Sequence, residues 1–381
     1  MTTDATSEVT LSRGLQEVYL DRTEASFIDG KAGVLEYRGY SIHDLAKNST
    51  FEETAFLLLY GDLPTQPQLT AFDAQLKAAR ALPEQVYDII RTVRQAHPMD
   101  VLRTAVSALA AYDPDRNDNS PEANIRKGVR LTSQFPVVVT AHNAIRLGKR
   151  PIAPDPKLSH AANFLYMLSG QAPSRDTAKL MDTDFVLHAE HGANASAFTA
   201  RVVTSTNADL HSSITAAVAA LSGPAHGGAA EDVMKMAVEI ADPSRAAQYV
   251  KDTLASGGRV TGFGHRVYKV EDPRARHMRE GVKKLSEERG EPKWYAILEA
   301  VVEAMQPYAR RGVHVNVDYY AGVVYHLLGV PTDLFVPIFA VGRVPGWTVQ
   351  IVEQFQHNIL IRPRLHYVGQ RERTYTPVKA R

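Results

Sequence analysis

The chain has 381 residues, which is too long for one small hydrophobic core and predicts two or three domains. Its 43 lysines and arginines against 42 aspartates and glutamates leave a net charge of +1, so no overall field favours nucleic acid or a membrane surface as a partner. The absence of cysteine excludes disulfides, thiolate metal sites and a cysteine nucleophile, and is consistent with a reducing compartment.

The N-terminal segment MTTDATSEVT is polar and has neither an apolar core nor an arginine-rich amphipathic pattern, so it predicts no signal or transit peptide. No uninterrupted apolar run approaches the roughly 18 residues that can span a bilayer. We therefore expect a cytoplasmic protein without a membrane-spanning segment.

The first regular elements are expected soon after this segment. Residues 26–39, SFIDGKAGVLEYRG, contain two apolar-rich arms around an Asp-Gly pair, which is typical of a short β-hairpin. Capping-box signatures then open two helices, Ser41 with Asp44 and Ser49 with Glu52. Beyond them apolar residues recur at helical spacing, so we predict an all-α, mostly helical protein with a short N-terminal β element.

The second half of the chain contains helices separated by glycine-rich or proline-rich breaks. HSSITAAVAALSG ends at Gly223, and GGAAEDVMKMAVEI follows it. DPRARHMREGVKKLSEERG runs from an Asp-Pro start to Gly290, and NVDYYAGVVYHLLG ends at Gly329. The ends of these helices carry His, Arg and Asp side chains, which makes them candidates for chemistry.

Two of these side chains lie at helix starts. His226, in LSGPAHGG, lies just before or within a first turn, where the helix dipole disfavours an imidazolium, and a neutral ring with one N–H suits a developing enolate oxygen. Asp318 follows Asn316, a good N-cap, so the same dipole favours an ionised carboxylate that could act as a general base. A capping histidine and a simple helix-start charge are the structural alternatives.

A second glycine-flanked histidine, His265 in TGFGHRVYK, precedes an arginine at a helix start. Arg274 follows Asp272 and Pro273, and a cation in a first turn requires a compensating anion. A substrate carboxylate is one candidate, and an ion pair to Asp272 or Glu271 is the other. The sequence leaves both open.

The segment HAEHGAN places His188 and His191 three residues apart. Histidines at this spacing can share a helix face and bind a metal, so a metal-dependent lyase or hydrolase is an alternative. There is no HExxH pattern and no third ligand nearby in sequence, so we expect no metal and favour substrate positioning by His191.

Two arginines near the C-terminus have apolar sequence neighbours. Arg343 lies in FAVGRVPGW and Arg362 in ILIRPRLHYVG. Buried or half-buried arginines need anions, which a dicarboxylate ligand or internal salt bridges could supply. The G-F-G at 262–264 lacks the third glycine and the preceding strand of a dinucleotide site, and no phosphate-binding P-loop occurs.

Taken together and in this order, these segments resemble the citrate synthase family over nearly the whole chain. The matching segments are FIDGKAGVLEYRGYSIHDLA, HPM at 97–99, HAEHGANASAFTARV, LSGPAHGGA, GFGHRVYKVEDPRA, NVDYYAGVVYHLLG, FAVGRVPGW and IRPRLHYVG. The resemblance implies condensation of acetyl-CoA with oxaloacetate and hydrolysis of the thioester to citrate and CoA. The CoA thioester is then a substrate, and no separate cofactor is expected.

The resemblance also implies roles for the site residues. Asp318 would remove a methyl proton from the thioester, His226 would donate to the enolate oxygen, and His265 would polarise the oxaloacetate carbonyl and protonate the new alkoxide. The residues that would hold the oxaloacetate carboxylates are His191, Arg274, Arg343 and Arg362. The family supplies the residue matching Arg362 from the partner subunit, which implies a homodimer. The residues matching the CoA region are Val260, Gly262, Phe263, Gly264, Lys269 and Asn316.

The family fold implies a large helical domain, residues 1–224 and 334–381, and a smaller helical domain, residues 225–333, with the active site in the cleft between them. The short N-terminus implies a dimer without the NADH regulation of the hexameric branch. Two departures from the family pattern concern the acyl pocket: Ala225 and Ala230 flank His226, and Gln350 stands where a histidine is common. 2-Methylcitrate synthase, which uses propionyl-CoA, therefore remains the alternative function, because one methylene is worth only about 1–3 kcal/mol in a pocket.

Overall fold

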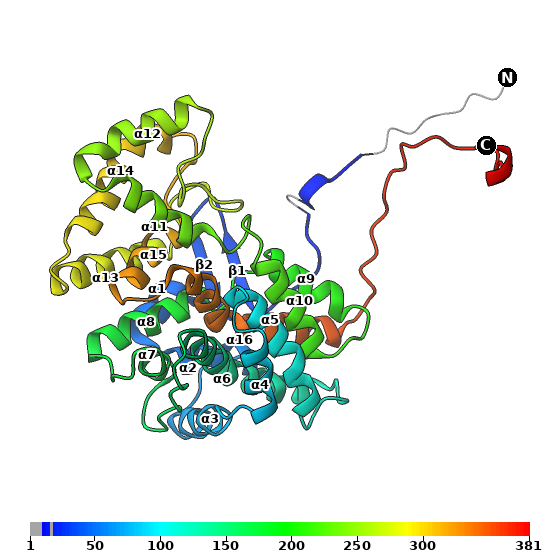
Figure 1. Ribbon diagram of the computed structural model, residues 1–381, viewed down its shortest axis with the longest axis horizontal. Helices are drawn as coiled ribbons and strands as arrows, with labels where there is room; N and C mark the ends of the chain where they lie inside the picture. The colour runs from blue at the N-terminus through cyan, green and yellow to red at the C-terminus, as the bar shows by residue number, and fades with distance from the viewer. Residues whose placement is uncertain (1–9, 16–17) are drawn as a thin grey trace.

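The computed structural model describes residues 10–15 and 18–381, so most of the polar N-terminal segment lies outside the described residues. Over this range it contains sixteen α-helices and one three-stranded sheet (Figure 1). The prediction of a mostly helical protein with a short N-terminal β element is confirmed.

The sheet forms from the segment predicted as a hairpin. β1 (Ser26–Asp29) pairs antiparallel with β2 (Val34–Tyr37), which pairs with β3 (Tyr40–Ser41). Leu35 and Tyr37 of β2 are buried, whereas their neighbours along the strand are only half-buried, as expected for a strand with one face on the core.

One group of helices packs around a central, almost fully buried helix, α16 (Phe335–Gln356). Together with the short 3₁₀ turn η4 (Thr332–Leu334) it forms a stretch long and apolar enough to cross a membrane by length and composition, but 94% of its apolar window is buried inside the protein. This stretch is therefore a core helix, which passes the same test of length and composition. The surrounding helices are α1 (Ile42–Asn48), α2 (Phe51–Tyr60), α3 (Gln66–Ala78), α4 (Glu84–Thr92), α5 (Pro98–Leu109), α6 (Pro121–Arg146), α7 (His160–Ser169), α8 (Arg175–His188), α9 (Ala195–Thr204) and α10 (Leu210–Leu221).

The capping boxes predicted for the first two helices are only partly correct. Ser41 caps α1, but its side chain accepts from the His43 N–H, at the second position of the helix. The N-cap of α2 is Thr50, which accepts from the Glu53 N–H at 3.2 Å. The Ser49 hydroxyl instead bonds the Thr54 hydroxyl. Because Ser49 and Thr50 are both suitable cap residues, the sequence could not tell which of them caps the helix.

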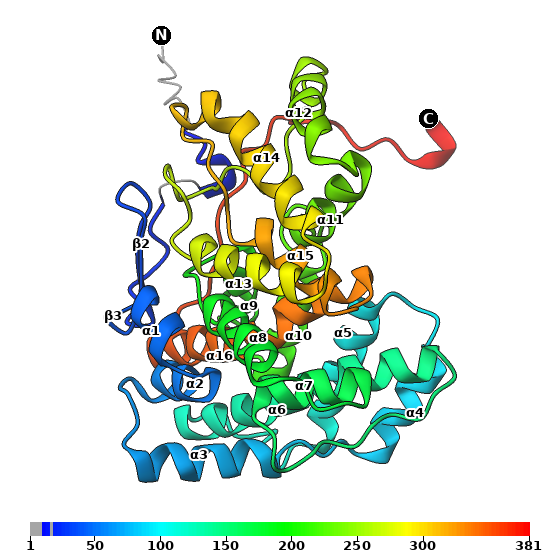
Figure 2. The same cartoon turned by 90° about the vertical axis from the view of Figure 1, so that its left-hand side faces the viewer.

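A second group of helices lies together at the upper end of the molecule in Figure 2. The bounds of these helices are α11 (Ala229–Ile240), α12 (Ala246–Ala255), α13 (Ala275–Glu288), α14 (Lys293–Ala309) and α15 (Asp318–Leu327). α15 packs on α11 and α13, and α12 packs on α14. One continuous hydrophobic cluster runs through both groups of helices.

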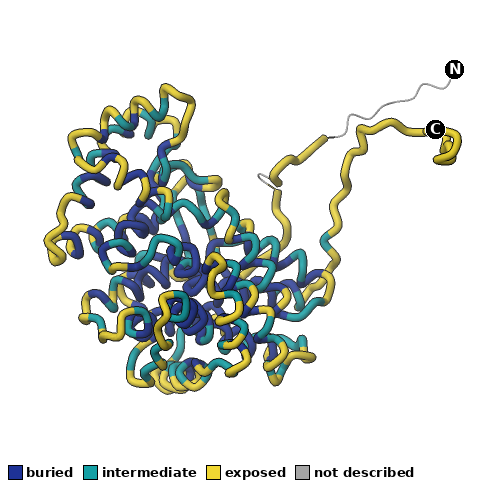
Figure 3. Tube along the Cα trace, in the orientation of Figure 1, coloured by how far each residue is buried: buried dark blue, intermediate teal, exposed yellow. Residues whose placement is uncertain are grey.

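The C-terminal end of the chain extends away from the body (Figure 3). After α16 the chain continues as an exposed C-terminal arm, residues 357–381, with only one short 3₁₀ turn. Large apolar side chains on this arm, such as Leu365, Val368 and Tyr375, are exposed to solvent. Apolar side chains gathered in this way on an extended arm are typical of a surface that another chain covers.

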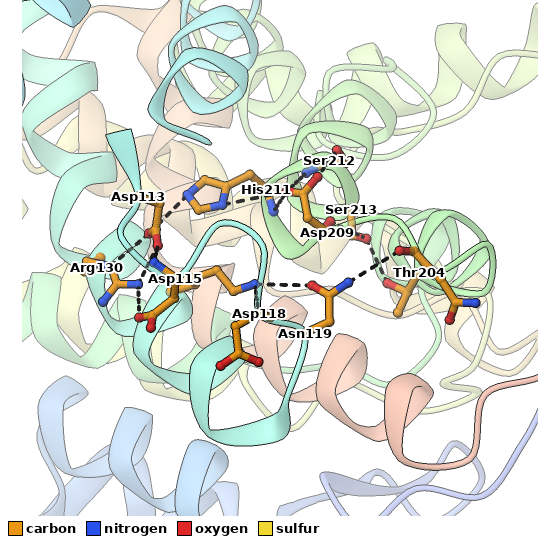
Figure 4. A network of polar contacts seen from close by, with 12 residues as sticks. Asp113, Asp115, Asp118, Asn119, Arg130, Thr204, Asp209, His211, Ser212 and Ser213 are labelled. Carbon is orange, nitrogen blue, oxygen red and sulfur yellow. Dashed lines mark hydrogen bonds and ion pairs between the residues drawn. The ribbon is translucent and has the colours of Figure 1, made fainter. Parts of the chain in front are cut away.

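A buried polar network ties the loop after α5 to the starts of α6 and α10 (Figure 4). Lys127 is fully buried, and its Nζ donates to the Asp118 carbonyl at 2.6 Å. Arg130 donates to both carboxylate oxygens of Asp113, and Oδ2 of Asp113 also lies 3.6 Å from Nε2 of the buried His211. This network satisfies buried charges at a helix junction that carries no predicted site residue, so we assign it a structural role.

Candidate active site

A tight turn between α8 and α9 carries the two histidines of HAEHGAN. Nε2 of His191 lies 3.1 Å from Oη of Tyr268, whereas Nδ1 of His188 lies 3.1 Å from Asp184. The two rings therefore have different partners, and the described residues contain no group of three His, Asp or Glu side chains that could hold a metal. Burial, together with the nearby Arg274, holds the pKa of His191 well below its usual value, so it is neutral.

His226 lies in the turn that connects α10 to α11. The backbone N–H of Ser196 donates to its Nε2 at 3.3 Å, which favours the tautomer that carries the ring proton on Nδ1. Among the described residues Nδ1 has no hydrogen-bond partner. Burial, and next the charge of Arg343, lower the pKa of His226 to about 4, so the ring is a neutral donor at pH 7.

His265 has its ring orientation fixed by the backbone that follows it. The N–H groups of Val267 and Tyr268 donate to its Nδ1 at 3.0 and 3.1 Å, so the ring proton lies on Nε2. Burial, and next Arg274, lower the pKa of His265 to about 4. The His265 and His191 rings meet edge to face, with centroids 5.2 Å apart.

Arg274 is the residue immediately before α13, and it is buried. Its Nε and Nη2 donate to the two carboxylate oxygens of Asp272 at 2.9 and 2.7 Å. Burial opposes the charged form, but this bidentate contact outweighs it and raises the pKa of Arg274. Asp272 is therefore the compensating anion in this chain, and Nη1 of Arg274 remains available for a second anion.

Arg343 projects from the centre of α16 and is fully buried. Its Nε donates to the carbonyl of His188, and its guanidinium lies 4.6 Å from the centre of the Phe339 ring. The same ring contacts His226, with centroids 6.2 Å apart. Burial lowers the pKa of Arg343 to about 10, although Glu190 opposes this change.

Asp318 is the first residue of α15, as predicted, but Asn316 is not its N-cap. The cap position is Val317, and Asn316 instead donates through Nδ2 to the Gly264 carbonyl at 3.2 Å. Burial raises the pKa of Asp318, and the nearby His188 and Arg274 oppose this change. Asp318 therefore lies near the same two arginines that influence the histidines: Arg343, which affects His226, and Arg274, which affects His265.

The residues matched to the CoA region lie together on a loop beside the start of α15. Phe263 bridges Val315, and the Gly264 N–H donates to the His314 carbonyl at 2.7 Å. Gly262 has a φ of +81°, and an added Cβ would come within 2.4 Å of Tyr319, so a larger residue does not fit there. Val260 is buried, whereas Lys269 is exposed.

Arg362 is the one predicted site residue that the fold of a single chain does not bring to the others. It lies exposed on the C-terminal arm.

A cavity of about 670 Å³ between α1, α8 and α13 is separate from the candidate site, since none of the predicted site residues lines it.

Sequence reasoning missed several residues that orient the site. Ser196 and Tyr268 hold His226 and His191, and Phe339 contacts His226 and Arg343. A single sequence carries no signal for these contacts, because they join residues far apart in the chain, such as Ser196 and His226. Tyr268 was the easiest of them to suspect, because it lies three residues after His265.

Comparisons with known proteins identify the family. The family model for the citrate synthase C-terminal domain matches residues 14–364. The chain belongs to the citrate synthase family. It is 44% identical to a citrate synthase of Haloferax volcanii over 97% of this chain and 99% of that protein. It is also 41% identical to a 2-methylcitrate synthase of Corynebacterium glutamicum, with 97% of each chain covered.

Solved structures of the family share the fold. A citrate synthase from Pyrobaculum aerophilum superposes with a TM-score of 0.92 at 37% identity, covering 96% of this chain and 94% of that one. The Thermoplasma acidophilum citrate synthase, a ternary complex with carboxymethyl coenzyme A and oxaloacetate, gives a TM-score of 0.92 at 33% identity, covering 97% and 99%.

Proposed function

We propose that this protein is a citrate synthase that condenses acetyl-CoA with oxaloacetate and hydrolyses the thioester to citrate and CoA. It is thus an acyltransferase that converts the acyl group into an alkyl group on transfer. One observation carries this proposal: segments far apart in the sequence bring two neutral imidazoles, with free protons on opposite ring nitrogens, toward a helix-start carboxylate and two buried arginines.

Each reacting group then has one task. Asp318 accepts a proton from the methyl group of the thioester, and the Nδ1 proton of His226 hydrogen-bonds the enolate oxygen that develops. The enolate carbon attacks the ketone of oxaloacetate, whose oxygen takes the Nε2 proton of His265, and the proton that Asp318 accepted restores the imidazole, so the proton count is unchanged. Water then breaks the C–S bond of the resulting citryl thioester, which releases citrate and the CoA thiol. Because both rings are neutral, each keeps one N–H that can donate to developing negative charge while its other nitrogen accepts the hydrogen bond that orients the ring.

The oxaloacetate carboxylates bind to cations that the fold has already oriented. Arg274 offers Nη1, since Asp272 occupies its other nitrogens, and Arg343 offers both terminal nitrogens, since only its Nε is used. His191 adds a neutral polar contact between them. The related Thermoplasma acidophilum citrate synthase was solved as a complex with oxaloacetate, which supports this dicarboxylate as the ligand of the proposed site.

The CoA thioester is proposed to bind along residues 260–264 and Asn316, with Lys269 facing a phosphate. We also propose that residues 225–333 form a small domain that closes on residues 1–224 and 334–381. Closure keeps water from the enolate until it meets the ketone, and a dicarboxylate held by Arg274 and Arg343 would draw the two units together.

We further propose a homodimer in which Arg362 completes the oxaloacetate site of the partner subunit. The exposed apolar side chains of the C-terminal arm support this arrangement, because burial against a second copy would remove them from water.

Release of free CoA thiol in the presence of oxaloacetate tests the activity. With acetyl-CoA as the acyl donor we expect turnover, and its absence would contradict the proposal. Propionyl-CoA tests the second candidate, 2-methylcitrate synthesis, which relatives of comparable identity support. A higher kcat/KM for propionyl-CoA than for acetyl-CoA would reverse the assignment.

A further inference from the structure

One fully buried carboxylate beside the site has no part in the proposed mechanism. Glu190 lies in the turn between His188 and His191. Its Oε1 accepts three hydrogen bonds, from the Gly192 N–H at 2.7 Å, Gln350 Nε2 at 2.8 Å and Ser26 Oγ at 3.2 Å. These contacts fix the carboxyl group and, through Gly192, the turn that presents His191.

The other oxygen of Glu190 is unsatisfied. Oε2 is buried and has no hydrogen-bond partner among the described residues. It lies against the backbone of Gly346, where an added Cβ would come within 2.6 Å of it. A desolvated oxygen without a donor disfavours the ionised form, and burial accordingly raises the pKa of Glu190 to about 7, although Arg343 lowers it.

The two arginines of the site differ in how their charge is compensated. Arg274 has a bidentate carboxylate partner in Asp272. Arg343 makes no salt bridge to an Asp or Glu in the described part of the chain, and its one hydrogen bond there goes to a carbonyl. Glu190 is therefore the buried acid that offsets the charge of Arg343 while the site is empty.

We propose that Glu190 takes up a proton when oxaloacetate binds, and that this residue couples the affinity for oxaloacetate to pH. The inference rests on the proposed function, because it requires a substrate carboxylate on Arg343. That carboxylate neutralises the charge of Arg343 in place of Glu190. The ionised form of Glu190 is then no longer stabilised by Arg343, so Glu190 binds a proton from solvent.

The charged and titratable groups near Glu190 come from three neighbouring elements and from its own turn. From α16 they are Arg343 and the uncharged Gln350, and from β2 it is Tyr37, whose pKa burial raises to about 12. Arg201 of α9 lies one hydrogen bond farther, joined to Gln350 and paired with Glu353. The flanking His188 and His191 form the rest of the turn, and His191 is neutral. Beyond Arg343 lie Arg274 and Asp318.

The sign of the pH effect follows from linkage. Below about pH 7 Glu190 is already protonated in the empty site, so binding takes up no proton. Above that pH binding is coupled to protonation of Glu190, so the Kd for oxaloacetate rises with pH, by up to about tenfold per unit until the pKa of Glu190 in the complex is reached. The ligand contributes nothing to this slope, since both of its carboxylates are ionised throughout.

Isothermal titration of oxaloacetate into the enzyme in buffers of different ionisation enthalpy counts the protons directly. For the wild-type enzyme we expect no uptake at pH 6 and close to one proton per site at pH 8.5. For Glu190→Gln, which keeps the shape and loses the titration, we expect no uptake at either pH and a Kd that does not change with pH.

Glu52→Gln is the matched control, since Glu52 is also a buried carboxylate with a raised pKa but lies on α2, away from Arg343. It should retain the wild-type proton uptake. Equal uptake in Glu190→Gln and wild type would overturn the inference. If Glu190→Gln fails to fold, the wild type alone decides, because uptake that does not change between pH 6 and 8.5 also contradicts it. A wild-type enzyme that gives no binding heat in any buffer would overturn the proposed function as well.

Discussion

At the scale of single residues, burial sets the protonation state of each proposed reacting group. It lowers the pKa of His226 and His265 to about 4, which keeps both rings neutral, and it raises the pKa of Asp318 toward the working pH. A base whose pKa lies closer to the working pH removes a weakly acidic proton more readily. The same desolvation therefore prepares donors and base together.

Replacing Asp318 tests its role as the base. We expect Asp318→Asn to lower kcat by about 100-fold or more, because general-base catalysis is lost, while the Kd for oxaloacetate stays near the wild-type value. Thiol release and calorimetry measure the two quantities. Asp44→Asn, at the start of α1, is the control and should leave turnover unchanged. Near-normal turnover of Asp318→Asn would exclude it as the base.

His160, which lies outside the proposed site, shows the effect of burial on stability rather than on catalysis. Burial, and next Arg80, lower the pKa of His160 to about 3, and its ring lies 4.6 Å from that of Phe51. The folded-state pKa is below the unfolded value, so this contribution to stability is complete above about pH 6.5 and is lost as the pH falls toward 3.

We expect His160→Phe to weaken the pH dependence of unfolding. Between pH 7 and pH 5 the wild-type protein should lose about 2 kcal/mol through this histidine, and the variant should not. Urea unfolding at the two pH values measures the difference. An equal loss in both proteins would mean that the ring of His160 is not what titrates.

At the scale of elements, α16 gathers the polar groups of the oxaloacetate site within a buried helix. Arg343, Gly346 and Gln350 follow one another at helical spacing of three and four, so they share one face. That face lies against the turn at 188–192. Gly346 has no side chain because the carbonyl of Ala189 occupies the space.

Gly346→Ala tests this close approach. An added Cβ would come within 2.1 Å of the Ala189 carbonyl, so the turn has to move. We expect a loss of about 2–4 kcal/mol in stability, in the range for overpacking a core, and a raised KM for oxaloacetate. Gly342→Ala, on the same helix, meets its nearest neighbours only at 3.3 Å and should cost less than about 1 kcal/mol. Equal effects of the two substitutions would contradict the proposed contact.

At the scale of the whole molecule, the fold of one chain leaves one proposed oxaloacetate ligand on an exposed apolar arm. Arg362 lies on that arm, whereas the other proposed ligands are buried. Closure of the proposed small domain and packing of the C-terminal arm against the partner subunit would each exclude water from the site. Both proposals therefore serve to protect the enolate from water.

Subunit mixing tests the shared site. His226→Ala and Arg362→Ala homodimers should each be inactive, but a heterodimer of the two has one site with both substitutions and one with neither. Random pairing after co-refolding should restore about a quarter of the wild-type sites.

A mixture of His226→Ala with Arg343→Ala is the matched control for this experiment. Both of these residues belong to the same chain's site, so no pairing rescues activity. Test-mixture activity that stays at the level of the control, with exchange confirmed by mass, would mean that Arg362 acts within its own subunit.

The sequence predicted the elements well where a local signal was strong. The hairpin around Asp29 was correct, and Asp318 lies in the first turn of α15 as predicted, because turn chemistry and helix periodicity act over a few residues. The cap at Ser49 was wrong by one position, since the neighbouring Thr50 could serve equally. The cap at Asn316 was wrong because that side chain bonds the distant carbonyl of Gly264 instead. Only the fold shows that the apolar stretch of α16 is a core helix, because length and composition do not tell a protein core from a membrane.

The sequence alone was enough to recognise the family and its candidate catalytic residues, since glycine-flanked histidines and helix-start acids are local patterns. Only the tertiary structure decided which ring nitrogen of His226 carries the proton, that Asp272 pairs with Arg274, and that Glu190 is buried with one oxygen unsatisfied. Protonation depends on partners and burial, and those come from distant segments: Ser196 lies 30 residues from His226, and Gln350 lies 160 residues from Glu190.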